Sequence, residues 1–307
     1  MSLQGQLVYL LVKNRHLFSF RLKPEIWDES TSVLAFRASA EASSLRMANK
    51  LPPGLVVEPF ELAGMRAEWL LPTGARKVPV ILYLVEGGYI SGSCNDHRTL
   101  VAKVAQASGI ATLMFDHRLA PEDPYPAALQ DTLAAYHWLL DQGIGPENIV
   151  IMGESAGGGL CLAALLAVRD QGLPLPAGAV AISPWTDLAL TGESYRTKAK
   201  VCISPPGMSA ICSKYYVGDH HPMEPWISPL YGDLHGLPPL YINVCENETL
   251  LDDSTRFAAK AKDAGVDTTL VVGLKMFHCY PMMAPMFPEA TQALQEICRF
   301  IREQLKR

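Results

Sequence analysis

Residues 148–160 read Asn-Ile-Val-Ile-Met-Gly-Glu-Ser-Ala-Gly-Gly-Gly-Leu and contain the pattern G-x-S-x-G, centred on Ser155. An apolar run typical of a strand comes before Ser155, and a segment rich in alanine and leucine, typical of a helix, comes after it. In a sharp strand–turn–helix connection the central serine takes strained backbone angles, for which the flanking glycines leave room. The turn also brings the Ala156 N–H and a helix N-terminus beside the serine, where they can stabilise negative charge. This stretch therefore predicts a nucleophilic Ser155; the alternative is an ordinary serine in a glycine-rich turn.

Around this stretch, short apolar runs alternate with longer helical patterns. The predicted strands are 55–60, 66–71, 80–85, 110–115, 149–152, 177–182, 240–244 and 269–272, and the predicted helices are 97–108, 127–141, 156–170, 253–264 and 289–305. The alternation predicts a single α/β domain over residues 1–307, with a mostly parallel, twisted sheet of about eight strands flanked by helices. Residues 1–45 and about 190–225 lack matching strands, so we expect them to form a helical cap over the carboxyl edge of the sheet.

Several further segments carry a resemblance to a known family. Three segments are similar to motifs that occur in the same order in the hormone-sensitive-lipase-like (bacterial family IV type) carboxylesterases. They are residues 89–93 followed by His97 and Arg98, residues 116–128 (Asp-His-Arg-Leu-Ala-Pro-Glu-Asp-Pro-Tyr-Pro-Ala-Ala) and residues 182–187 (Ile-Ser-Pro-Trp-Thr-Asp). The Gly-Glu-Ser-Ala-Gly-Gly turn resembles the same family. The resemblance implies an α/β-hydrolase fold, a serine nucleophile at Ser155 and hydrolysis of carboxylic esters.

A catalytic base is expected after the last strand. The fold places its catalytic residues in the chain order serine, acid, histidine. Of the histidines downstream of Ser155, only His278 follows the last predicted strand and precedes the final helix. A base in that loop can accept the serine proton during attack on a carbonyl. We therefore predict His278 as the base; the alternative is a histidine that only packs in its loop.

The acid is expected after the strand at 240–244. Aligning the following loop on residues 250–253, Leu-Leu-Asp-Asp, puts Asn247 in the acid position. An asparagine can hold the ring of His278, but it supplies no charge to stabilise the imidazolium. Glu246 and Glu248, one residue to either side, are the alternative partners of His278.

The loop that binds the oxyanion also departs from the family pattern. Residues 85–88 read Val-Glu-Gly-Gly where the family has His-Gly-Gly-Gly. The resemblance assigns the amide donors to Gly87 and Gly88, with Ala156 as the third. Glu86 places a potential negative charge near the developing oxyanion, which opposes its stabilisation. A protonated Glu86, or one acting as an acid or base in different chemistry, is the alternative.

These residues support three hypotheses about function. The first is a serine carboxylesterase that hydrolyses small to medium acyl esters through an acyl-enzyme on Ser155. The second is a repurposed enzyme of the same fold, such as an acyltransferase, lyase or cyclase of a biosynthetic pathway, which uses Ser155 and Glu86 non-hydrolytically. The third is a non-catalytic protein that binds a small molecule in the retained pocket.

The amino-acid composition limits the kinds of partner and the cellular location that we expect for this chain. A formal net charge of −5 argues against nucleic-acid binding. The seven cysteines are scattered without a C-x-x-C pair, which favours reduced thiols and a cytoplasmic protein. The apolar run Leu7–Val12 is too short for a transmembrane segment and predicts an amphipathic helix. No pattern indicates a metal or a cofactor, so we expect none. The resemblance implies a possible homodimer.

Overall fold

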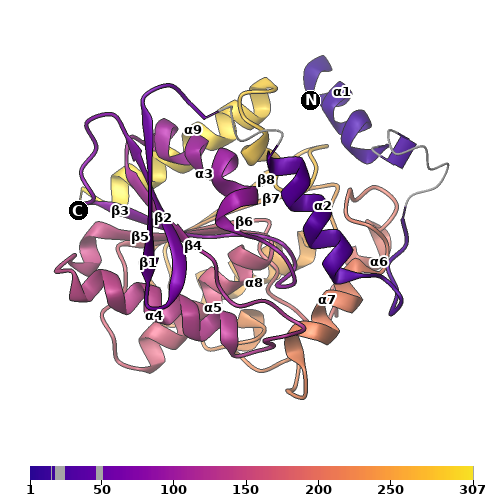
Figure 1. Ribbon diagram of the computed structural model, residues 1–307. Coiled ribbons are helices and arrows are strands. Elements are labelled where there is room, and N and C mark those ends of the chain that lie inside the picture. Colours follow the sequence, from indigo (N-terminus) through magenta and orange to yellow (C-terminus); the bar gives the residue numbers. More distant parts are fainter. Residues whose placement is uncertain (15, 18–24, 46–50, 307) are drawn as a thin grey trace.

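The computed structural model describes residues 1–14, 16–17, 25–45 and 51–306, and it contains an eight-stranded sheet with helices on both faces (Figure 1). The strands are β1 (Leu55–Leu62), β2 (Met65–Pro72), β3 (Val80–Leu84), β4 (Ala111–Phe115), β5 (Ile149–Glu154), β6 (Gly178–Ile182), β7 (Leu240–Cys245) and β8 (Thr268–Gly273). The helices are α1 (Leu3–Lys13), α2 (Val33–Leu45), α3 (Cys94–Ser108), α4 (Ala127–Asp141), α5 (Ala156–Asp170), α6 (Ser194–Thr197), α7 (Met208–Val217), α8 (Leu251–Asp263) and α9 (Pro288–Gln304).

The sheet has the strand order β1-β2-β4-β3-β5-β6-β7-β8. β1 pairs antiparallel with β2, and β2 pairs antiparallel with β4, whereas every pairing from β4 through to β8 is parallel. This confirms the predicted α/β-hydrolase architecture. Several boundaries differ by one to three residues. For example, α3 begins three residues before its predicted start, since Ser93 and Asp96 form a reciprocal capping box at its first turn.

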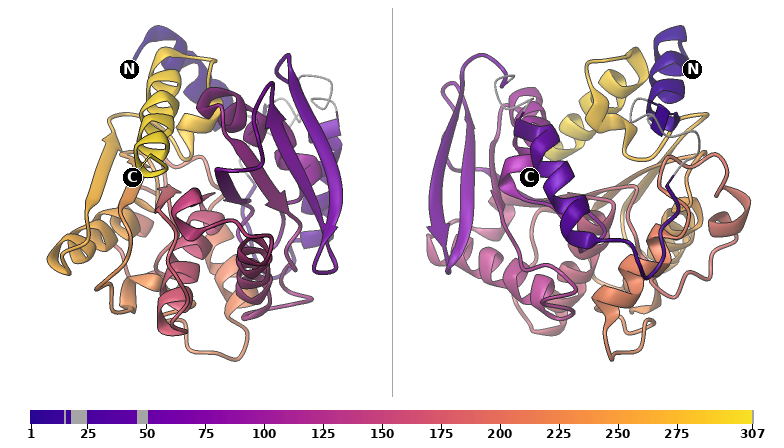
Figure 2. Two further views of the ribbon diagram at one scale, coloured as in Figure 1. Left: turned by 90° about the vertical axis from the view of Figure 1, so that its left-hand side faces the viewer. Right: turned by 45° about the vertical axis from the view of Figure 1, so that its right-hand side comes forward.

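Two hydrophobic layers enclose the sheet. Because side chains alternate along a strand, Leu82 and Leu84 of β3 pack with the buried residues of α4, α5 and α8, whereas Ile81 and Tyr83 pack with those of α3 and α9. Figure 2 shows α9 on one side of the sheet, with α4 and α5 on the other. β3 and β5 are buried along their whole lengths, so their carboxyl ends hold the following loops on a rigid base.

The segments expected to form the cap contain α1 and α2 near the N-terminus, and α6 and α7 farther along the chain; residues 15 and 18–24 of the expected cap lie outside the described residues. The Tyr9 ring of α1 stacks on Phe277 at 6.0 Å, and its hydroxyl donates to the Val201 carbonyl at 2.9 Å. Arg37 of α2 donates to the Ile90 and Ala120 carbonyls. These contacts attach both N-terminal helices to loops of the main fold.

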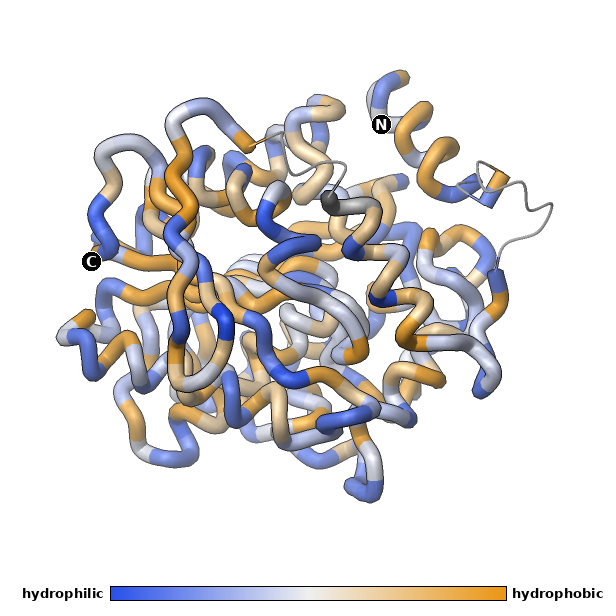
Figure 3. The backbone as a smooth tube through the Cα atoms, viewed as in Figure 1, coloured by the Kyte–Doolittle hydropathy of each residue, from blue (hydrophilic) through white to orange (hydrophobic). Residues whose placement is uncertain are grey.

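Helix α1 leaves several leucines exposed, and its hydrophobic colouring is visible in Figure 3. No helix among the described residues is both long enough and apolar enough to cross a membrane.

Candidate active site

Ser155 lies in the turn between β5 and α5. Its backbone angles are φ 53° and ψ −120°, a strained conformation for a residue with a side chain. The two flanking glycines are required by close backbone contacts: a Cβ on Gly153 would lie 2.2 Å from the Gly157 carbonyl oxygen, and a Cβ on Gly157 would lie 2.2 Å from the Leu84 carbonyl oxygen. The Ser155 carbonyl accepts the N–H of Trp185 at 3.0 Å, which ties the turn to the loop after β6. The turn therefore has the geometry that the G-x-S-x-G pattern predicts.

His278 lies in the loop between β8 and α9, as expected. Its Nδ1 forms a very short hydrogen bond with the Glu248 carboxylate, which is fully buried. The other Glu248 oxygen accepts the Ser183 hydroxyl at 2.8 Å and the Cys245 N–H at 2.7 Å. Glu248 is therefore a well-satisfied buried carboxylate that orients the imidazole ring and stabilises its positive charge.

The expectation that Asn247 occupies the acid position is corrected by this geometry. Glu246 and Asn247 form a turn directly after β7, and the next side chain, Glu248, points back to His278. Glu246 instead accepts the Lys275 N–H at 2.9 Å on the protein surface. The carboxylate beside His278 thus comes from Glu248, one residue farther along the chain than the position that the Leu-Leu-Asp-Asp stretch predicts.

The loop of residues 85–88 follows β3 and lies beside Ser155. Gly87 and Gly88 have φ values of 135° and 64°, which side chains rarely tolerate. A Cβ on Gly87 would also lie 2.2 Å from the Ser91 carbonyl oxygen. The two glycines thus allow the backbone to turn tightly at the cavity wall.

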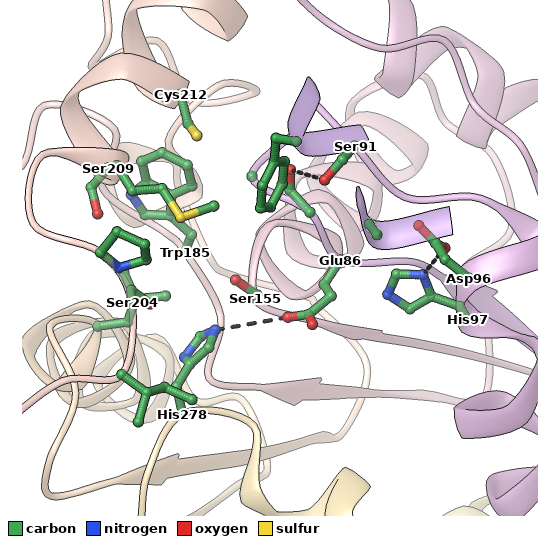
Figure 4. A pocket seen from close by; sticks show the side chains of 18 of the residues that line it. Glu86, Ser91, Asp96, His97, Ser155, Trp185, Ser204, Ser209, Cys212 and His278 are labelled. Carbon is green, nitrogen blue, oxygen red and sulfur yellow. Dashed lines mark hydrogen bonds and ion pairs between the residues drawn. The ribbon is translucent and has the colours of Figure 1, made fainter. Parts of the chain in front are cut away.

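Glu86 extends from this loop toward His278, with Ser155 beside them (Figure 4). Its Oε2 lies 3.8 Å from His278 Nε2, the ring nitrogen that does not contact Glu248. Burial lowers the pKa of His278, but the charges of Glu248 and Glu86 outweigh it and raise this pKa to about 9. Glu86 therefore stabilises the protonated imidazole of His278.

A second cluster of charged residues, formed by Asp96, His97 and Glu154, lies near Glu86, and the sequence did not reveal it. His97 Nδ1 is 2.5 Å from Asp96, and His97 Nε2 is 3.8 Å from the buried carboxylate of Glu154. Burial, followed by the charge of Glu86, raises the pKa of Glu154 to about 7. Burial lowers the pKa of His97, but Asp96 outweighs it and raises this pKa to about 9. The only sequence signals were Glu154 inside the serine turn and His97 after the glycine loop.

One cavity of about 490 Å³ brings together the residues described above: it is lined by Glu86, Gly87, Gly88, Ser155 and His278. Both expected cap segments contribute to the wall of this cavity, through Val12, Phe36, Ile203, Pro205, Met208 and Cys212. This wall is largely apolar. The cavity is therefore suited to an apolar group held against Ser155.

Comparisons with known proteins agree with this geometry. Residues 81–282 match a family model described as the alpha/beta hydrolase fold. An acetyl-hydrolase of Streptomyces hygroscopicus is 40% identical over 254 residues, which cover 82% of this chain and 83% of the relative. An esterase of Acinetobacter venetianus is 38% identical over 250 residues, covering 81% and 82% of the two chains. A crystal structure of an esterase from the bacterial hormone-sensitive lipase family is 40% identical, with a TM-score of 0.90 over 99% of both chains.

Proposed function

Because the chain belongs to the α/β-hydrolase family and is a carboxylic ester hydrolase of the hormone-sensitive-lipase-like type, we propose that Ser155, His278 and Glu248 are its catalytic triad. The observation that carries this proposal is the buried Glu248–His278 pair, whose imidazole lines the same cavity as the strained Ser155. The relatives do not favour a non-hydrolytic enzyme or a protein that only binds a ligand.

Each member of the triad has a distinct task. Ser155 Oγ attacks the ester carbonyl while His278 Nε2 accepts its proton. Glu248 holds the Nδ1–H of the ring and stabilises the imidazolium that forms. The imidazolium then gives its proton to the departing alcohol, which leaves an acyl group on Ser155. In the second half of the reaction His278 activates water, and the acid product is released.

The amides of Gly87, Gly88 and Ala156 are the proposed donors to the oxyanion. Gly87 and Gly88 line the cavity with Ser155, and Ala156 is the first residue of α5, where the helix N-terminus favours negative charge. Glu86 acts against this stabilisation because its carboxylate faces the same space. We therefore assign Glu86 a restraining influence on hydrolysis at neutral pH rather than a role in the triad.

The proposed substrates are small to medium acyl esters. The apolar wall formed by Phe36, Ile203 and Met208 can bury an acyl chain, and the cavity of about 490 Å³ limits the length of chain that fits. Since the cap supplies these side chains, it sets the acyl preference.

Hydrolysis of a series of p-nitrophenyl esters, from acetate to decanoate, tests this function. We expect activity on the shorter esters, and a loss of at least about 10³-fold in kcat for Ser155→Ala. Ser209→Ala is the matched control because Ser209 lines the same cavity, and it should retain activity. Equal activity in wild type and Ser155→Ala, or equal losses in both variants, would show that Ser155 is not the nucleophile.

A further inference from the structure

Three potential metal ligands of different chemistry meet beside Ser155. Cys279 Sγ lies 3.5 Å from His278 Nε2 and 3.8 Å from Glu86 Oε2, and these last two atoms are 3.8 Å apart. The three atoms thus form a nearly equilateral triangle. Cys279 is buried, whereas the Glu86 carboxylate lies at the cavity wall.

The size of this triangle fits a zinc ion. A point about 2.1 Å from each atom lies at its centre, and zinc bonds to nitrogen, oxygen and sulfur measure about 2.0 to 2.3 Å. Three protein ligands with an open fourth position are also the arrangement of zinc sites that remain accessible to small molecules. We propose that Glu86, His278 and Cys279 bind a single Zn²⁺ or a similar thiophilic divalent cation.

The surroundings of His278 and Cys279 support binding. The Nδ1 side of His278 is engaged by Glu248, so the Nε2 lone pair of the neutral ring faces the triangle. Histidines that bind zinc commonly have such a carboxylate on the other ring nitrogen. The Cys279 N–H donates to the Ser183 hydroxyl at 3.2 Å, and that hydroxyl donates to Glu248. The hydrogen bonds of Glu248 and Ser183 therefore hold His278 and Cys279 in place before a metal binds.

Metal binding at this place has a consequence for hydrolysis. As the metal binds at neutral pH, the thiol proton of Cys279 and the Nε2 proton of the imidazolium of His278 both pass to solvent, and the Nε2 lone pair is taken up by the metal. That lone pair is the one that would accept the proton of Ser155. The cation is therefore a reversible inhibitor; this consequence rests on the proposed function, whereas the binding itself does not.

Binding is tested by equilibrium dialysis with Zn²⁺ and by the absorption spectrum with Co²⁺, using a phosphine reductant that does not chelate metals. We expect one Zn²⁺ per chain, competition between Zn²⁺ and Co²⁺, and a cobalt–thiolate charge-transfer band. Cys279→Ala should abolish the band, and both Cys279→Ala and Glu86→Gln should weaken Zn²⁺ binding by at least about tenfold. Cys212→Ala is the matched control, since Cys212 lines the same cavity outside the triangle.

The Ser155→Ala variant separates this proposal from the esterase mechanism. It should bind Zn²⁺ as tightly as the wild type, whether or not the wild type hydrolyses esters. In an active wild type, Zn²⁺ should inhibit hydrolysis, and Cys279→Ala should require at least about tenfold more Zn²⁺ for the same inhibition. A wild type without the thiolate band, or Zn²⁺ binding that is equal in wild type, Cys279→Ala and Glu86→Gln, would overturn the proposal.

Discussion

Replacing Glu86 by glutamine should make the enzyme more active at neutral pH. Hydrolysis requires neutral His278, so kcat/KM rises with pH and reaches half its maximum near the His278 pKa, which is about 9. Glu86 stabilises the imidazolium from a distance of 3.8 Å. Removing this charge lowers the pKa of His278, and the rising limb of the pH profile moves to lower pH.

The size of the shift in the His278 pKa follows from the distance between Glu86 and His278 and from the exposure of the Glu86 side chain. Two unit charges at such a separation interact by about 1 kcal/mol in bulk water and by about 4 kcal/mol near a protein surface. The side chain of Glu86 is 33% exposed, so solvent screening keeps the interaction toward the lower value. Since about 1.4 kcal/mol corresponds to one pKa unit, we expect a shift of about one unit. The neutral fraction of His278 at pH 7, and with it kcat/KM, should then rise about tenfold.

The assay is the pH dependence of kcat/KM on p-nitrophenyl butyrate between pH 5.5 and 10, with EDTA present to remove divalent cations. Glu246→Gln is the matched control, because it neutralises a carboxylate that contacts the Lys275 N–H rather than His278. That profile should coincide with the wild-type profile. An unchanged midpoint in Glu86→Gln, or an equal shift in both variants, would refute the electrostatic account of Glu86.

Three further substitutions test other parts of the site. Gly157→Ala should lower the free energy of unfolding by about 1–3 kcal/mol and abolish hydrolysis, because the new Cβ would lie 2.2 Å from the Leu84 carbonyl oxygen; urea denaturation and an ester assay check this. Asp253→Ala should cost about 2–4 kcal/mol in the same denaturation experiment, since its buried carboxylate accepts two backbone N–H groups at 2.8 and 2.9 Å. Met208→Trp should reduce kcat/KM for the octanoate ester relative to the acetate ester by about tenfold, because Met208 lines the apolar wall that we propose holds the acyl chain.

Local sequence patterns were sufficient to predict the strands, the main helices and the turn that holds Ser155. The buried strands are mostly apolar, and the turn at Ser155 depends on glycines only two residues away, where close backbone contacts leave no room for a side chain. His278 could also be predicted, because its position after the last strand follows from the chain order of the fold.

The partner of His278 could not be chosen from the sequence. Glu246, Asn247 and Glu248 follow Cys245 in a row, and the turn at Glu246 and Asn247 decides which of their side chains points inward. The Leu-Leu-Asp-Asp stretch used for alignment includes Asp253, whose carboxylate binds backbone N–H groups of the loop after β6 and contributes to packing. Likewise, no local pattern joins Glu86 to Cys279, since they lie in loops after different strands.

The most direct test of the triad compares the rates at which a fluorophosphonate labels Ser155 in the wild type, Glu248→Gln and Asn247→Ala. The buried contact of Glu248 with His278 predicts a rate lower by about 10³- to 10⁴-fold in Glu248→Gln, and a rate within about threefold of wild type in Asn247→Ala. Mass spectrometry of the labelled peptide should place the adduct on Ser155. A rate in Glu248→Gln close to that of the wild type, or a larger loss in Asn247→Ala, would contradict the account.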